Sequence, residues 1–118
     1  MKVIIAGSRH MPEEAYPLIG QAVVASGFSP DEVVCGMAAG ADLLGRRWAK
    51  THNIPVKEFP AQWRIYGHAA GPIRNKQMMN YADALIVFIY NGSRGSANML
   101  MQMRNAEKPC FVVENGAL

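Results

Sequence analysis

The chain has 118 residues, a length typical of one domain with its own hydrophobic core. Half of the residues are hydrophobic and 18% are charged, which excludes a disordered segment, and no apolar run approaches the roughly 20 residues that cross a bilayer. The net charge of +3 comes without a basic run, so we expect small anions, and not nucleic acid, as partners.

The first apolar run, KVIIA at residues 2–6, ends at Gly7, as expected of a strand buried on both faces. Because this run begins at the second residue, without the layout of a signal peptide, we expect a cytosolic protein with no membrane association. Residues 13–26 then place apolar side chains on one helical face, and Gly27 ends the helix.

The remainder of the chain continues this alternation of strands and helices. In chain order we predict strand 32–35, helix 39–53, strand 55–59, helix 71–82, strand 84–90, helix 96–108 and strand 109–113. Such alternation predicts a Rossmann-like, doubly wound α/β fold, a parallel five-stranded sheet with helices on both faces. Right-handed crossovers favour the strand order 3-2-1-4-5 within a single domain over residues 1–118.

Glycine, serine and arginine gather in the segments that leave the carboxyl ends of the strands. These segments are GSRH (7–10), CGMAAGAD (35–42), the long connection 60–71 and NGSRGS (91–96). Ligands of doubly wound sheets bind at this edge. Free N–H groups at helix starts favour phosphate or carboxylate, and arginine adds bidentate donors. We therefore predict an anion site, with NGSRGS as a phosphate cradle.

The predicted ligand site combines groups from all of these segments and from the helix that follows the long connection. Its members are Gly7, Ser8, Arg9, Gly36, Met37, Ala38, Gly40, Asp42, Trp63, Tyr66, Arg74, Asn75, Ser93, Arg94, Gly95 and Ser96. Asp42 either caps its helix or contacts a ribose hydroxyl. Trp63, Tyr66 and His68 either pack the long connection or offer an aromatic surface on which a base stacks. His10 and His52 have no partner in the sequence and receive no role.

The sulfur-containing residues suggest no further chemistry. Cys35 and Cys110 lie in separate apolar runs without CxxC spacing, which favours free thiols over a disulfide or a metal site. A stripe of methionines indicates core or a subunit interface and not a cofactor site; its members are Met78, Met79, Met99, Met101 and Met103. We expect no metal, no cofactor and a homo-oligomer.

Four motifs resemble a known family in both sequence and order. They are GSRH at 7–10, CGMAAGAD at 35–42, WRIYGHAAGPIRN at 63–75 and SRGSANM at 93–99. The chain thereby resembles the YspA, or cpYpsA-related, branch of the SLOG superfamily over nearly its whole length. This resemblance implies a Rossmann-like domain that binds nucleotide-derived ligands.

A more distant similarity is to the lonely-guy phosphoribohydrolases, which cleave the N-glycosidic bond of a cytokinin riboside monophosphate. The similarity aligns Arg74 with their helix arginine, and Asn75 replaces the paired lysine. Met99 replaces the glutamate of their phosphate loop, and glycoside cleavage needs a carboxylate at its oxocarbenium-like transition state. The candidate catalytic residues are accordingly Arg74 and, as a substitute carboxylate, Asp42.

Three functions are compatible with these features. We expect a protein that binds a phosphorylated nucleoside derivative, such as ADP-ribose, NAD or a related signalling nucleotide, for sensing or sequestration. The alternative is an enzyme, a nucleoside-monophosphate phosphoribohydrolase. A nucleic-acid-processing accessory ranks last: related SLOG domains occur in a DNA-uptake protein, but this chain has no basic run.

Overall fold

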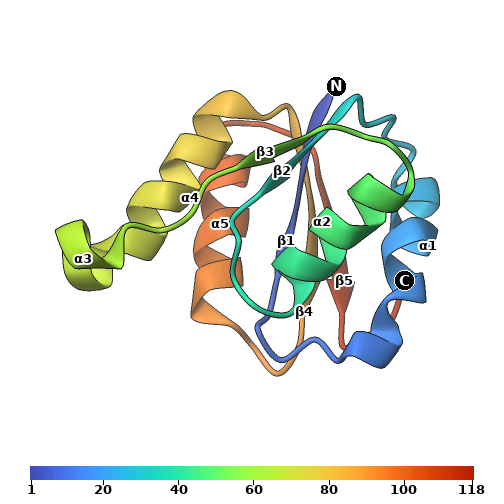
Figure 1. Ribbon diagram of the computed structural model, residues 1–118, viewed down its shortest axis with the longest axis horizontal. Helices are drawn as coiled ribbons and strands as arrows, with labels where there is room; N and C mark the ends of the chain where they lie inside the picture. The colour runs from blue at the N-terminus through green and yellow to red at the C-terminus, as the bar shows by residue number, and fades with distance from the viewer.

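A computed structural model describes all 118 residues as a five-stranded sheet between two layers of helices (Figure 1). The strands are β1 (Lys2–Gly7), β2 (Glu32–Cys35), β3 (Val56–Glu58), β4 (Ala84–Ile89) and β5 (Cys110–Glu114). They lie in the order β3-β2-β1-β4-β5, and all four pairings are parallel. The predicted fold class and strand order are confirmed.

Helices cover both faces of the sheet. α1 (Pro17–Ser26) and α2 (Ala41–Thr51) pack on one face, whereas α4 (Ala70–Tyr81) and α5 (Arg94–Asn105) pack side by side on the other (Figure 1). None of these helices combines the length and the apolar character that a membrane span requires.

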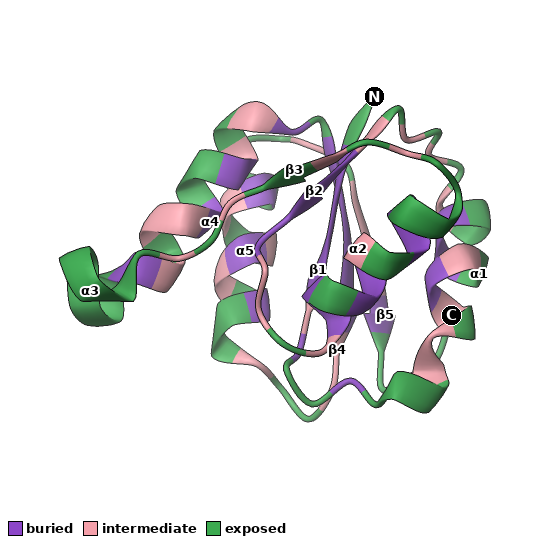
Figure 2. Ribbon diagram, viewed as in Figure 1, coloured by how far each residue is buried: buried purple, intermediate pink, exposed green.

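The central strand β1 explains why its sequence has no polar interruption. Val3 and Ile5 belong to the core beneath α1 and α2, while Ile4 and Ala6 belong to the core beneath α4 and α5. Successive side chains of a strand point to opposite faces, so a strand covered on both faces must be apolar throughout. Figure 2 shows the buried residues concentrated along these central strands.

The predicted helix at 13–26 forms in two parts. Residues Glu13–Ala15 make a short 3-10 helix, and α1 begins only at Pro17. Proline lacks the backbone N–H that a helix interior needs but fits the first helical position, which explains the break.

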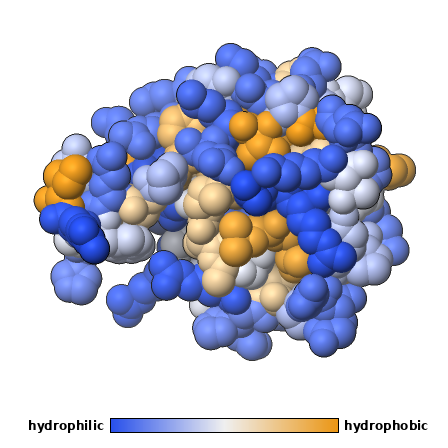
Figure 3. Space-filling view, viewed as in Figure 1, coloured by the Kyte–Doolittle hydropathy of each residue, from blue (hydrophilic) through white to orange (hydrophobic).

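The connection from β3 to α4 differs most from the expectation of a long loop. It contains a four-residue helix, α3 (Trp63–Tyr66), and a 3-10 turn, η2 (Gly67–Ala69). α3 projects from the body of the molecule beyond the start of α4 (Figure 1), and Figure 3 shows hydrophobic atoms at this projection beside strongly hydrophilic ones. Four residues are too few to display a helical period, so the sequence pattern could not reveal α3.

The sulfur-containing residues mostly serve the core. Cys35 is buried and Cys110 is half-buried, and both thiols are free. Met78, Met99 and Met103 are buried in the core beneath α4 and α5, whereas Met101 is exposed, so the methionine stripe is only partly core.

Candidate functional site

The segments rich in glycine, serine and arginine meet at the carboxyl edge of the sheet and enclose a cleft of about 550 Å³. The cleft lies where the strand order reverses between β1 and β4. Most of the predicted site residues line it: Gly7, Ser8, Arg9, Ala38, Asp42, Trp63, Arg74, Asn75, Ser93, Arg94, Gly95 and Ser96. The predicted site residues are thus brought together at one edge by the parallel arrangement of the strands.

The GSRH segment turns sharply after β1. The Ser8 N–H donates to Phe88 O at 2.8 Å, and the Ser8 hydroxyl accepts from the His10 N–H at 3.1 Å. Ser8 is fully buried, while Arg9 and His10 are exposed. The buried serine therefore fixes the turn and leaves both basic side chains available at the cleft.

The start of α5 forms the opposite wall of the cleft. Ser93 is the N-cap, and its hydroxyl accepts from the Ser96 N–H at 3.4 Å. Ser96 itself is 4% exposed, and its hydroxyl oxygen is the one buried side-chain oxygen or nitrogen without a hydrogen-bond partner. Because an unpaired buried hydroxyl is unfavourable, this position favours an incoming hydrogen-bonding group.

Asp42 joins two of the glycine-rich segments. Its Oδ1 accepts from the Gly7 N–H at 3.3 Å, and its Oδ2 accepts from the Ala38 N–H at 3.1 Å. Neither hydrogen bond caps α2, the helix that carries Asp42. Asp42 was expected either to cap this helix or to contact a ribose hydroxyl, and its role in joining the two segments was not predicted. Burial raises the pKa of Asp42 to about 6, against the opposing effects of the Ala38 N–H and Arg74.

We expect the Asp42→Asn substitution to reduce the pH dependence of stability. The folded-state pKa exceeds the ordinary value of 3.8. The contribution of this carboxyl to the free energy of unfolding is therefore fully present below pH 3.8 and is lost as pH rises through about 6. The free energy of unfolding should fall by about 2–3 kcal/mol over this range. Urea unfolding at pH 4.5 and pH 7.5 should show the wild type losing stability relative to the variant; parallel pH profiles would contradict this account.

Arg74 and Asn75 connect the walls of the cleft. Arg74 donates through Nη1 to Gly36 O and through Nε to the Asn75 Oδ1, the latter at 3.0 Å. The Asn75 amide donates in turn to Gly95 O at 3.2 Å and to the Asn98 Oδ1 at 3.0 Å. The guanidinium is thus held in a fixed position between the β2 segment and α5.

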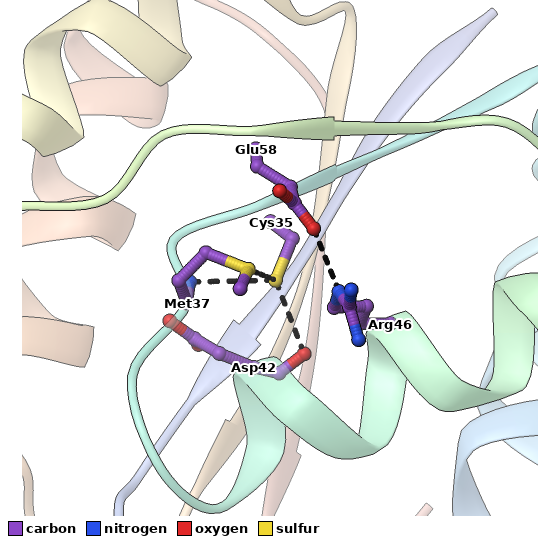
Figure 4. A network of polar contacts seen from close by, with 5 residues as sticks. All are labelled: Cys35, Met37, Asp42, Arg46 and Glu58. Atoms are coloured by element: carbon purple, nitrogen blue, oxygen red, sulfur yellow. Dashed lines mark hydrogen bonds and ion pairs between the residues drawn. The ribbon is translucent and has the colours of Figure 1, made fainter.

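Cys35 supports the segment that follows β2 (Figure 4). The thiol accepts from the Met37 N–H at 3.3 Å and lies 3.3 Å from Asp42 O. Burial raises the pKa of Cys35 to about 11, so the group is a thiol at neutral pH and a structural contact. Beside it, Arg46 and Glu58 form an ion pair at 2.7 Å between α2 and β3 (Figure 4).

Four predicted residues lie outside the main cleft. Gly36 and Met37 line a smaller adjacent cavity, whereas Gly40 and Tyr66 line neither. Gly40 has φ 76°, and a Cβ there would lie 2.4 Å from Ser8 O, so Gly40 packs beneath the GSRH turn and supports it.

Several cleft residues are absent from the predicted ligand-site set, although His68 was considered as a stacking residue and His10 and Gly92 belong to the predicted segments GSRH and NGSRGS. The absent residues are Ala6, His10, His68, Gly71, Pro72, Met78, Gly92, Asn98 and Met99. Ala6, His10 and Gly92 directly adjoin a predicted member in sequence, and this adjacency is the signal that could have found them. Arg9, Arg74 and Arg94 give the lining three positive charges, His10 and His68 also line it, and Asp42 is its only carboxylate.

No protein-family model matches the chain, and no curated protein matches it. Two solved structures share its fold. One is DNA processing protein A from Helicobacter pylori, whose single-stranded DNA binding mode has been described; it matches at TM-score 0.66 and 18% identity over 95% of this chain and 64% of that chain. The other is DNA processing protein A from Streptococcus pneumoniae. It matches at TM-score 0.58 and 13% identity, over 95% of this chain and 58% of that chain. The chain spans less than two thirds of either.

These similarities correct four expectations. The assignment to the YspA branch is wrong, because the solved structures that share the fold are DNA processing protein A. The same finding overturns the expected nucleotide-derived ligand and the alternative of a phosphoribohydrolase. It also overturns the expectation against nucleic acid, since the Helicobacter pylori protein binds single-stranded DNA. Met99, which replaces the glutamate of the hydrolases, is buried and apolar, and both oxygens of Asp42, the one carboxylate of the cleft, accept backbone N–H bonds from Gly7 and Ala38.

Proposed function

We propose that the chain binds single-stranded DNA, with the phosphate backbone in the cleft at the carboxyl edge of the sheet. The observation that carries this proposal is the basic lining, in which three arginines and two histidines face one buried carboxylate. Lys and Arg contacts to phosphate supply most of the affinity of non-specific nucleic-acid binding. The shared fold with DNA processing protein A supports the same function, and that fold is compatible with a SLOG-type domain.

The start of α5 is the best candidate for a phosphate contact. Backbone N–H groups of the first helical turn and the positive end of the helix dipole favour an anion there. Ser96 lines this part of the cleft, and its buried hydroxyl has no hydrogen-bond partner within the protein. Arg94 is exposed beside it and belongs to none of the ion pairs of the chain. These groups together form a small, preorganised anion site.

The remaining basic side chains extend this site along the edge of the sheet. Arg9 is exposed on the GSRH turn, and Arg74 is held by Gly36 O and Asn75 on the far wall. A positively charged groove that follows the backbone is the usual means of binding single strands without sequence preference. We therefore expect binding that depends strongly on salt and weakly on base sequence.

Replacement of Arg94 with alanine tests this function. Anisotropy titrations of a fluorescent thymidine oligonucleotide at several salt concentrations should show about three- to tenfold weaker binding. The salt dependence should also become shallower, by about 0.7 in log–log slope for one lost phosphate contact.

Arg104→Ala is the matched control, because Arg104 is an exposed arginine at the opposite end of the same helix. This variant should bind as the wild type does. Equal losses for the two variants would indicate a general charge effect, and absence of binding by the wild type would reject the proposed function.

A further inference from the structure

Trp63 lies where two cavities meet. The smaller cavity, of about 260 Å³, shares Arg9, Ala38, Trp63 and Arg74 with the lining of the main cleft. Its other lining residues include Pro60 and Ala61, which follow β3. The two cavities therefore adjoin along the carboxyl edge of the sheet, from the start of α5 towards β3.

The Trp63 side chain is not part of the core. It is 48% exposed and belongs to neither core cluster, although its ring lies 3.5 Å from the position that a Cβ on Gly71 would occupy. One part of the indole is thus supported by α4, and the rest is open to solvent. A large aromatic surface held in this way beside basic groups is suited to contact with a planar ligand.

The smaller cavity acts as an extension of the main cleft. Its volume of about 260 Å³ is below the roughly 300–1,000 Å³ of a typical independent ligand pocket. Arg9 and Arg74 stand in the wall common to both cavities, where a phosphate linking two nucleotides would meet positive charge. An aromatic surface, a basic wall and a second cavity thus lie next to one another along this edge of the sheet.

We infer that a single strand passes from the main cleft into the smaller cavity, with one base stacked on the Trp63 indole at the boundary. This inference rests on the proposed function and adds the path of the strand and its base-binding residue. Stacking accepts every base, so Trp63 contributes affinity without sequence preference.

The two tryptophans of the chain provide a direct test. Trp48 is 8% exposed and stacks on His52 within the other layer of the protein, so a bound strand does not reach it. Thymidine oligonucleotides should quench the emission of the wild type and of the Trp48→Phe variant, whereas the Trp63→Phe variant should show no quenching. Quenching that persists in Trp63→Phe would overturn the inference.

Affinity measurements separate stacking from phosphate binding. The Trp63→Leu variant should bind a thymidine oligonucleotide roughly 5- to 100-fold more weakly than the wild type. Both proteins should bind an abasic strand of the same length equally, because only its phosphates are available. Equal thymidine affinities would reject the role of Trp63 and leave the proposed function intact, while a wild type that binds neither strand would reject the proposed function itself.

The second cavity has its own test. Ala61→Leu should partly fill it, and Ala69→Leu is the control because Ala69 is exposed on η2 and lines neither cavity. We expect Ala61→Leu alone to weaken a six-nucleotide strand severalfold and to leave a dinucleotide unaffected. Equal behaviour of the two variants towards both lengths would place the strand outside the second cavity.

Discussion

Replacement of Gly7 with alanine should destabilise the protein by about 3 kcal/mol or more. Gly7 ends β1 beside Phe88 of β4, and an added Cβ would lie 2.1 Å from Phe88 O and 2.9 Å from the Ala41 Cβ. The same Phe88 carbonyl accepts the Ser8 N–H at 2.8 Å, so relief of the clash would separate the strands at the cleft. Urea unfolding at neutral pH measures the loss.

Gly95→Ala is the matched control for Gly7→Ala. A Cβ on Gly95 would have no neighbour within 4 Å, and its backbone is helical at the start of α5. Alanine suits a helix better than glycine, so stability should rise by up to about 1 kcal/mol. Similar losses for the two variants would show that close packing at Gly7 is not the cause.

The Ser93→Asp substitution should weaken binding of single-stranded DNA by about thirtyfold to several hundredfold. Aspartate caps helices as well as serine does, so α5 should keep its first turn. The new carboxylate would, however, stand where we place a phosphate, and like charges a few ångströms apart repel by roughly 2–4 kcal/mol at an effective dielectric constant near 20. Anisotropy titration at low salt measures the loss.

Ser93→Asn separates charge from shape in that experiment. Asparagine is also a good N-cap and is nearly isosteric with aspartate, but it carries no charge. We expect this variant to bind within about threefold of the wild type. If the aspartate and asparagine variants bind equally, no phosphate lies at the start of α5.

Much of the fold was predictable because hydrophobic pattern and topology are linked. The uninterrupted apolar run of β1 requires helices on both faces, and alternation of strands and helices then requires parallel pairing. The same topology places the segments after β1, β2, β3 and β4 on one edge. For that reason the sequence also predicted which residues surround the cleft.

The nucleic-acid expectation was wrong for a physical reason. A basic run is positive charge on neighbours in sequence, whereas Arg9, Arg74 and Arg94 are far apart in the chain and were assigned to a site for small anions alone. Folding brings all three to one cleft. The bridging role of Asp42 and the unpartnered hydroxyl of Ser96, by contrast, are marked by no sequence pattern and required the three-dimensional arrangement.

The central claim is that a single DNA strand binds at the carboxyl edge of the sheet, and amide chemical-shift mapping tests it most directly. A ¹⁵N-labelled sample titrated with a thymidine oligonucleotide should show its largest shifts in segments 8–10, 36–38 and 92–96 and at the Trp63 indole N–H. Largest shifts at the opposite edge, in the turns 27–31, 52–55 and 106–109, would contradict the account.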